Sequence, residues 1–295
     1  MGKKLKAALL IGLPLVLLLV AFLYLRHTNI PVLSPQGPVG QKERYLIILA
    51  AALSLVVVIP VFILLAVFAI RYREGNTKAK YDPNSDHSRI LEFIWWAVPL
   101  ALILILAGIT WRSSHELDPF KPLSSPVQPL DIQVVAMDWK WLFIYPKQNI
   151  ATVNFVEFPV DTPLNFEITA DAPMNSFWIP QLGGQIYAMS GMSTYLHLMA
   201  TSPGDYRGSS ANISGEGFAG MKFIAKADSQ SDFDQWVKLV GQTRDKLSLA
   251  AYNKLALPSK NNPIGYYSSV DKDLFNKVVL KYNQPPQTKP AAGAR

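Results

Sequence analysis

The stretch Gly208-Ser-Ser-Ala-Asn-Ile-Ser-Gly-Glu-Gly-Phe-Ala-Gly-Met221 leads directly into the alternating segment Met221-Lys-Phe-Ile-Ala-Lys226. Its four glycines and its hydroxyl residues predict a tight loop at the rim of a β-domain, where the backbone takes unusual angles. A loop held by a rigid scaffold in this way can present side chains to a metal ion. The stretch nevertheless contains no Cys and no His, and Met221 is its one soft donor. The sequence therefore predicts the frame of a metal site without the usual ligands.

Strand-like patterns surround this loop from Leu130 to Ala227. Apolar residues alternate with polar ones over Leu164–Ile168 and Thr194–Ala200, and the segment Ile132–Ile144 is rich in β-branched and aromatic residues. Turn signals containing Pro, Gly, Asp or Asn separate these segments. Short strands at this spacing predict a Greek-key β-sandwich or barrel of roughly 100 residues.

Helical spacing replaces alternation after the β-region. Ser231 is expected to cap a helix whose apolar residues recur at intervals of three and four. A second apolar stripe covers 274–279, so we expect an aromatic-rich helical C-terminal region over 231–282. Residues 283–295 are rich in Pro, Ala and Gln and are expected to be a disordered tail. The residues of the first stripe are Phe233, Trp236, Val237 and Val240.

Three uncharged apolar runs precede residue 112. They are Ala7–Leu25 with 19 residues, Tyr45–Ile70 with 26 and Phe93–Trp111 with 19. At 1.5 Å per residue, each is long enough to cross a hydrocarbon core of about 30 Å. We expect a transmembrane helical hairpin over 45–112, and residues 1–30 fit either a signal peptide or an uncleaved membrane anchor.

Charge fixes the expected orientation of the hairpin. The loop 71–92 carries five Lys and Arg residues, which the positive-inside rule places in the cytoplasm, with the β-domain outside. The net charge of +7 therefore follows from membrane topology and does not indicate nucleic-acid binding. The absence of cysteine excludes disulfides, thiolate metal sites and Cys nucleophiles.

This order of elements, two spanning helices and then an external β-sandwich, resembles subunit II of the haem–copper terminal oxidases. Met137-Asp-Trp-Lys-Trp141 resembles the Trp-x-Trp segment of that family, and Met174-Asn-Ser-Phe-Trp-Ile-Pro180 stands where the family has its first copper histidine. The loop 208–221 is similar to the family's Cys-Ser-Glu-x-Cys-Gly-x-x-His-x-x-Met copper loop. The resemblance runs from about Leu33 to Tyr282 and implies a cupredoxin-like domain over 130–227.

The resemblance also shows which copper ligands have changed within the loop. Ser210 and Ser214 stand at the two cysteines, and Asn212 stands at the glutamate. Phe218 stands at the loop histidine, whereas Met221 keeps the methionine.

The remaining ligand position, the first histidine of the family, is Asn175 in this chain. Five of the six positions thus differ from the family pattern, and we expect no metal in this chain. A binuclear centre bridged by thiolates needs its two sulfurs, and hydroxyls are neither soft nor readily ionised. This loss is the pattern of the family's quinol-oxidising branch.

Membership of that branch would imply a non-redox subunit of a proton-pumping ubiquinol oxidase, which couples ubiquinol oxidation to the reduction of O₂ to water. No cofactor is then expected in this chain, because haem and copper belong to the large catalytic subunit. The implied partners are that large subunit, the smaller subunits and membrane lipid. The implied location is the bacterial inner membrane, with the β-domain on the periplasmic side. Glu92, at the start of the second span, is the candidate for proton uptake into a neighbouring channel.

Each of these residues also has a purely structural interpretation. Glu92 could be an ordinary anionic helix start, Trp139 and Trp141 core or interface aromatics, and His197 a hydrogen-bonded strand residue. Five methionines could be core and contact residues or a thioether site for Cu(I). The latter would make the chain a membrane-tethered copper-binding protein that acts alone. These methionines are Met174, Met189, Met192, Met199 and Met221.

Overall fold

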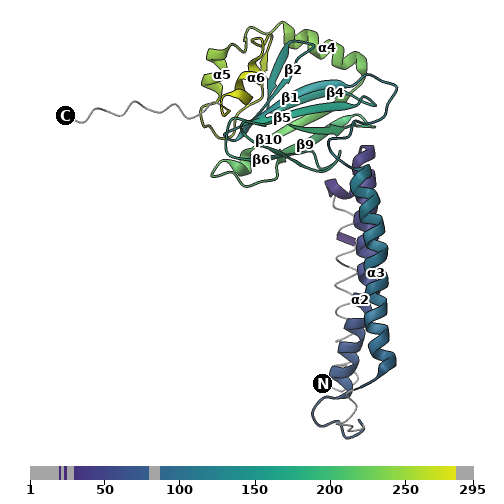
Figure 1. The fold of residues 1–295 in the computed structure, drawn as a ribbon. Coiled ribbons are helices and arrows are strands. Elements are labelled where there is room, and N and C mark those ends of the chain that lie inside the picture. Colours follow the sequence, from purple (N-terminus) through teal and green to yellow (C-terminus); the bar gives the residue numbers. More distant parts are fainter. Residues whose placement is uncertain (1–19, 21–22, 25–29, 80–86, 284–295) are drawn as a thin grey trace, which may run out of the picture. The chain divides into compact units, whose positions relative to one another are not determined.

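The computed structural model describes residues 20, 23–24, 30–79 and 87–283. The chain divides into two compact units, which Figure 1 draws together although their relative positions are not determined. One unit covers 42–121, and the other combines the segment up to Gln41 with the chain from Pro122 onwards. The expected signal peptide or anchor over 1–30 and the expected tail over 283–295 lie outside the described residues, apart from residues 20, 23, 24, 30 and 283.

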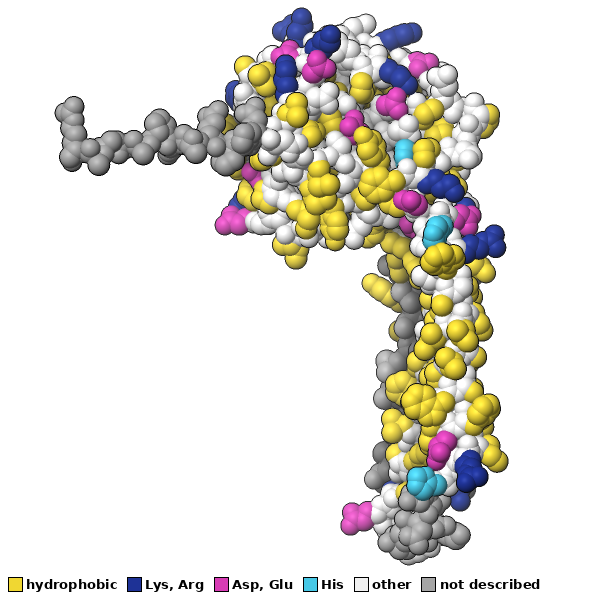
Figure 2. All heavy atoms as spheres, viewed as in Figure 1, with side chains coloured by type: hydrophobic (Ala, Val, Ile, Leu, Met, Phe, Trp, Pro, Cys, Tyr) yellow, Lys and Arg dark blue, Asp and Glu magenta, His cyan; other side chains and the backbone are white. Residues whose placement is uncertain are grey.

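The helical unit is a hairpin of two long apolar helices, α2 (Pro38–Arg71) and α3 (Arg89–Glu116). Both are long and apolar enough to cross a membrane. Apolar side chains cover their outer surfaces along the length of the hairpin (Figure 2). Helix α2 starts at Pro38 rather than at Tyr45, because proline suits the first helical turn, where no backbone N–H partner is lost. Pro60 lies within this continuous helix.

Two sheets form the β-domain, which confirms the predicted sandwich. The first sheet has six strands in the order β11-β3-β2-β1-β5-β8, and the second has five in the order β4-β10-β9-β6-β7. Most neighbours are antiparallel, but β1 pairs with β5 and β4 pairs with β10 in parallel. The strands are β1 (Leu130–Met137), β2 (Lys140–Tyr145), β3 (Ile150–Val153), β4 (Phe155–Pro159), β5 (Leu164–Ala170), β6 (Asn175–Trp178), β7 (Ile186–Ala188), β8 (Thr194–Leu198), β9 (Gly204–Ser210), β10 (Lys222–Asp228) and β11 (Gly265–Tyr267).

The main core lies between these sheets and is strongly aromatic. Phe177 stacks on Phe223 with ring centroids 5.1 Å apart and an interplanar angle of 7°. Trp141 meets the Phe177 ring edge-on at 5.3 Å. Such aromatic pairs add favourable contact energy to the burial of their large apolar area.

The C-terminal region belongs to the same unit as the sheets. Its helices are α4 (Gln230–Gly241), α5 (Leu249–Leu255) and α6 (Leu274–Leu280), and its short strand β11 extends the six-stranded sheet beside β3. A second apolar cluster forms where residues of α5 and α6 cover the face of this sheet that points away from the main core. The predicted cap Ser231 is wrong: Ser229 caps α4, since its Oγ accepts the Asp232 N–H at 3.1 Å.

The segment before α2 lies against the β-domain as a strap. Gln36 N–H donates to the Gln181 carbonyl at 2.7 Å, and Gly40 N–H donates to the Leu182 carbonyl at 3.0 Å. A Cβ at Gly37 would lie 2.1 Å from the Met199 carbonyl oxygen, so only glycine permits this approach. The strap thus follows the β-domain closely up to the first turn of α2.

Candidate functional site

The loop between β9 and β10 contains little regular secondary structure and lies at one end of the five-stranded sheet. Only a single 3-10 turn, η2 (Phe218–Gly220), interrupts it. The neighbouring strand β6 pairs with β9 through Phe177 opposite Ser210, which brings the start of the loop beside Asn175. Two segments far apart in sequence therefore meet at this end of the sheet.

Three of the predicted positions form one hydrogen-bonded cluster, in which Asn175 and Ser210 are buried and Asn212 is half-buried. Ser210 Oγ lies 3.0 Å from Asn175 Oδ1 and 3.1 Å from the Asn212 carbonyl oxygen, and its single proton can satisfy one of them at a time. The Asn212 side-chain amide donates to the Met174 carbonyl at 2.9 Å. The Asn175 amide donates to the Pro173 carbonyl at 2.7 Å. We call Asn175, Ser210 and Asn212 the amide–hydroxyl cluster.

The second half of the loop is built on the Trp139 ring. Trp139 Nε1 donates to the Ser214 carbonyl at 3.2 Å. A Cβ at Gly217 would lie 2.2 Å from Trp139 Cδ2, so the loop backbone rests directly on the indole. On the same ring, Lys260 Nζ lies 5.7 Å from the centroid and forms an ion pair with Glu216 at 2.5 Å.

The remaining predicted positions do not join the cluster. Met221 is 1% exposed and belongs to the main core, and the half-buried Phe218 opens the η2 turn. Ser214 Oγ is buried without a hydrogen-bond partner among the described residues. The structure thus brings Asn175, Ser210 and Asn212 together, while Ser214, Phe218 and Met221 make separate contacts.

The side chains at the six predicted positions do not fit a thiolate-bridged copper centre. The positions offer amide and hydroxyl oxygens and one thioether, and the oxygens of the cluster are already engaged in neutral hydrogen bonds. Within the described ranges, no group of three or more His, Cys, Asp or Glu side chains is placed to hold a metal ion. A soft, redox-active copper requires softer ligands than this site supplies.

Trp139 and Trp141 lie in different surroundings. Met137 pairs with Lys140, so Asp138 and Trp139 form a two-residue turn between β1 and β2, with Trp139 at φ 62°. Trp141 is fully buried in the main core. The break in the strand pattern was hidden because the turn carries an aromatic residue in a conformation that usually favours Gly or Asn.

The other candidate side chains make structural contacts. His197 Nδ1 lies 2.8 Å from Asn165 Oδ1 across the β5–β8 pair, as expected for a hydrogen-bonded strand histidine. The methionines divide between the core and the surface, with Met221 buried and Met174 and Met192 about half exposed. This distribution favours core and contact roles for the methionines.

Two charged residues that the sequence did not single out hold the C-terminal region on the sheet. Lys140 is 1% exposed, and its ammonium donates to the Leu255 carbonyl at 2.8 Å, the Leu257 carbonyl at 2.8 Å and Ser259 Oγ at 2.6 Å. The first carbonyl closes the end of α5, where a cation complements the helix dipole. Burial lowers the pKa of Lys140 from its usual value.

Asp171 is the second of these charged residues. Its buried carboxylate accepts hydrogen bonds from Tyr252 at 2.8 Å, Lys281 at 2.7 Å and Tyr282 at 2.5 Å. Burial alone opposes ionisation, but the hydrogen bonds from Lys281, Tyr282 and Tyr252 outweigh it and lower the pKa of Asp171. Burial and the same carboxylate raise the pKa of Tyr282 to about 12. We call Lys140 and Asp171 the charged anchors.

Glu92 lies in the first turn of α3, which Ser88 caps. Its side chain is 44% exposed, and its Oε1 lies 3.4 Å from His87 Nδ1. Glu92 was predicted from the sequence but His87 was not, because the two residues meet only through the turn that starts the helix.

Comparison with known proteins gives consistent relatives over nearly the whole chain. The COX Aromatic Rich Motif matches residues 242–286, the region that the charged anchors hold. The cytochrome bo(3) ubiquinol oxidase subunit 2 of Pseudomonas putida is 51% identical over 272 residues, covering 92% of this chain and 87% of that protein. The ubiquinol oxidase subunit 2 of Acetobacter aceti is 49% identical, covering 88% and 85%. The quinol oxidase subunit 2 of Bacillus cereus is 41% identical, covering 83% and 84%.

Proposed function

Since the chain belongs to the ubiquinol oxidase subunit 2 family, we propose that it is the non-redox subunit of a proton-pumping ubiquinol oxidase. In that complex, electrons from ubiquinol reduce O₂ to water at haem and copper in the large catalytic subunit. This chain would hold and cover that subunit without carrying electrons itself. Its two apolar helices would anchor it in the bacterial inner membrane, with the β-domain on the periplasmic side.

The amide–hydroxyl cluster is the observation that carries this proposal. A soluble electron donor needs an acceptor centre on the outer domain, whereas ubiquinol delivers its electrons from within the bilayer. At the position of that centre the chain has neutral, hydrogen-bonded side chains, with Ser210 Oγ 3.0 Å from Asn175 Oδ1. Such a cluster stabilises the loop but accepts no electrons.

Exposed apolar side chains around the cluster support a role in assembly. Ile213 is 79% exposed, Tyr187 50%, Met192 46% and Met174 43%. They flank the loop 208–221 and the β6–β7 pair, where apolar side chains gain by contact with another protein. We propose that this rim contacts a partner subunit of the oxidase.

Purification of the complex tests the proposal. The tagged chain is isolated from detergent-solubilised membranes, its reduced-minus-oxidised spectrum is recorded, and O₂ uptake is measured with ubiquinol and separately with reduced cytochrome c. We expect haem bands and uptake driven by ubiquinol alone. A haem-free preparation that binds Cu(I) stoichiometrically would instead favour the second candidate, a copper-binding protein that acts alone through its five methionines.

Glu92 is the proposed proton-uptake residue of this subunit. Its carboxylate lies at the start of a spanning helix, is partly exposed and contacts His87. Glu92→Gln should slow ubiquinol-driven turnover and proton uptake by about tenfold, because the amide cannot carry a proton. Haem content and subunit ratio serve as the controls for assembly. Unchanged turnover in a fully assembled variant would show that Glu92 serves only as an anionic residue at the start of the helix.

A further inference from the structure

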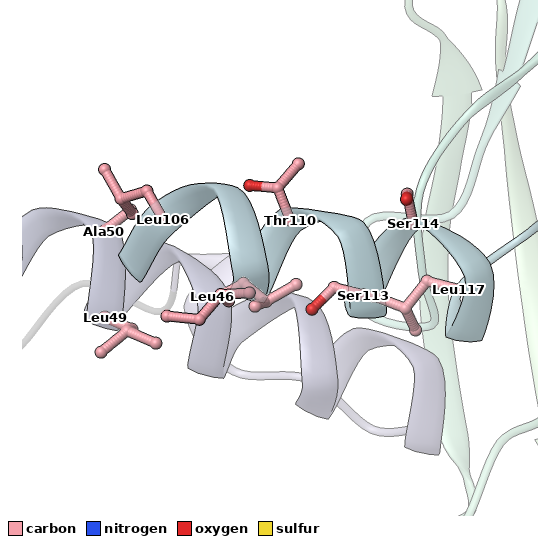
Figure 3. A pocket seen from close by; sticks show the side chains of 9 residues that line it. Leu46, Leu49, Ala50, Leu106, Thr110, Ser113, Ser114 and Leu117 are labelled. Carbon is pink, nitrogen blue, oxygen red and sulfur yellow. The ribbon is translucent and has the colours of Figure 1, made fainter. Parts of the chain in front are cut away.

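A groove of about 310 Å³ lies between α2 and α3, near the end of the hairpin that carries Lys42 and Glu116. Figure 3 shows its lining from both helices, with Leu46 and Leu49 on α2 and Leu106 and Ser113 on α3. Most of the exposed lining is apolar. All of these residues belong to the helical unit, so the groove is a property of the hairpin itself.

The groove exists because small residues interrupt the contact seam of the hairpin. Leu46 and Leu49 on α2 are half-buried, as are Leu106 and Ile109 on α3, and they recur at helical spacing. The next half-buried position on α3 is Ser113, where the side chain is too short to fill the seam. A seam position without a large apolar side chain leaves space that another molecule can occupy.

Hydroxyl groups line one end of this otherwise apolar groove. Thr110, Ser113 and Ser114 occupy adjacent turns of α3. Ser114 Oγ donates to the Trp111 carbonyl at 3.0 Å. The hydroxyls of Thr110 and Ser113 make no hydrogen bond to any residue that the structure describes, so both are available to a ligand. In a membrane, an available hydroxyl next to apolar residues suits the ester oxygens of a lipid.

A pair of opposite charges lies beyond the hydroxyls. Lys42 Nζ lies 2.5 Å from Glu116 Oε1, and the two side chains are 51% and 45% exposed. Lys42 precedes Leu46 by one helical turn, and Glu116 adjoins Leu117, which also lines the groove. The order along the hairpin is therefore apolar side chains, hydroxyls, and then a cation beside an anion.

We propose that this groove binds one zwitterionic phospholipid whose headgroup carries a primary ammonium. An acyl chain would lie along Leu49 and Leu106, with ester oxygens at the Ser113 hydroxyl. The lipid phosphate would approach Lys42, and its ammonium would approach Glu116. This headgroup has the same two charges as the protein pair, whereas an anionic headgroup leaves Glu116 facing a negative charge. The lipid would fill the seam and act as a fixed part of the subunit.

Native mass spectrometry of the detergent-solubilised complex, containing the full tagged chain, tests the proposal. The delipidated complex is titrated with an equimolar mixture of phosphatidylethanolamine and phosphatidylglycerol, and the bound lipids are counted and identified. We expect the wild-type complex to retain one more phosphatidylethanolamine than Ser113→Leu, which fills the groove with a larger side chain. Occupancy of that lipid should fall by about tenfold in this variant.

Matched variants separate the groove from the general lipid surface. Ser54→Leu makes the same substitution on α2 outside the groove lining and should leave the bound lipid unchanged. Glu116→Gln should leave one lipid bound but abolish the preference for phosphatidylethanolamine over phosphatidylglycerol. Equal lipid loss in Ser113→Leu and Ser54→Leu would overturn the proposal. A density map of the complex that places a helix of another subunit in the groove would overturn it as well.

Discussion

The two buried polar groups of the β-domain differ in charge and in what they connect. The amide–hydroxyl cluster joins β6 to the adjoining loop through neutral hydrogen bonds. The charged anchors join the six-stranded sheet to residues 81 to 119 positions away in sequence. Neutral hydrogen bonds contribute about 1 kcal/mol each, whereas hydrogen bonds to charged groups contribute about 1.5 to 3 kcal/mol. We therefore expect the stability of this domain to depend more on the contacts that hold the C-terminal region than on the loop 208–221.

The largest expected effect is at Lys140. Lys140→Ala removes three hydrogen bonds, leaves the Leu255 and Leu257 carbonyls without this donor and opens a cavity at a buried side chain, so we expect a loss of about 3 to 4 kcal/mol. Urea unfolding of a fragment covering 30–41 fused to 122–283 measures the loss. The exposed Lys222→Ala serves as the control, with an expected change within about 0.5 kcal/mol. If the two substitutions lower the free energy of unfolding equally, Lys140 does not anchor the C-terminal region.

Asp171 tests the same anchor through pH. Asp171→Asn should cost about 2 to 3 kcal/mol at pH 7, because three hydrogen bonds lose their charged acceptor. The folded pKa of Asp171 lies below the usual 3.8, so its stabilising contribution is complete only well above this unfolded value and is lost as the pH falls through the folded pKa. The difference between wild type and variant should therefore shrink on acidification. A difference that stays constant down to pH 2 would contradict an ionised Asp171 in the folded domain.

Gly217 tests how much the packing of the loop 208–221 on Trp139 contributes to stability. Gly217→Ala places a Cβ 2.2 Å from Trp139 Cδ2, while its φ of −87° suits any residue, so the expected cost of about 1 to 3 kcal/mol is steric. Gly241→Ala, at the end of α4 with open space around its Cβ, is the matched control and should be neutral or slightly stabilising. Similar unfolding midpoints for both variants would show that the loop accommodates the added Cβ without a steric cost.

The smallest expected effect is at Ser210. Ser210→Ala removes one neutral hydroxyl and should cost about 1 kcal/mol, because Asn175 loses one of its partners. Ser209→Ala, on the neighbouring half-buried position, provides the control. If Ser210→Ala destabilises the domain as much as Lys140→Ala, the proposed difference between the cluster and the anchors is wrong.

The parts of the fold that depend on local patterns could be predicted from the sequence. Uncharged runs of helical length predicted the hairpin, and alternation with turn residues predicted the sandwich. The resemblance to the family's copper loop located the positions of the amide–hydroxyl cluster. Boundaries were less certain, since Ser229 and Ser231 are equally good cap residues and only the chain direction at the end of β10 selects Ser229.

The anchors could not be predicted because their partners lie far away along the chain. Lys140 stands between two tryptophans, and nothing in that local pattern indicates that its ammonium reaches the end of α5. Strand β11 was missed for a similar reason: Gly265-Tyr-Tyr267 is too short to show alternation, and pairing with β3 defines it. Long-range pairing thus determined what local periodicity left open.

The position of β11 and α6 has a consequence for how the chain folds during synthesis. The six-stranded sheet lacks its edge strand until residue 267 is available, and the apolar face beneath α6 stays uncovered until residue 278. The strands from β1 onwards therefore keep a sheet edge and an apolar surface open to other chains while more than a hundred further residues are translated. A chaperone that shields this sheet would act in that interval and would no longer be needed once α6 has packed.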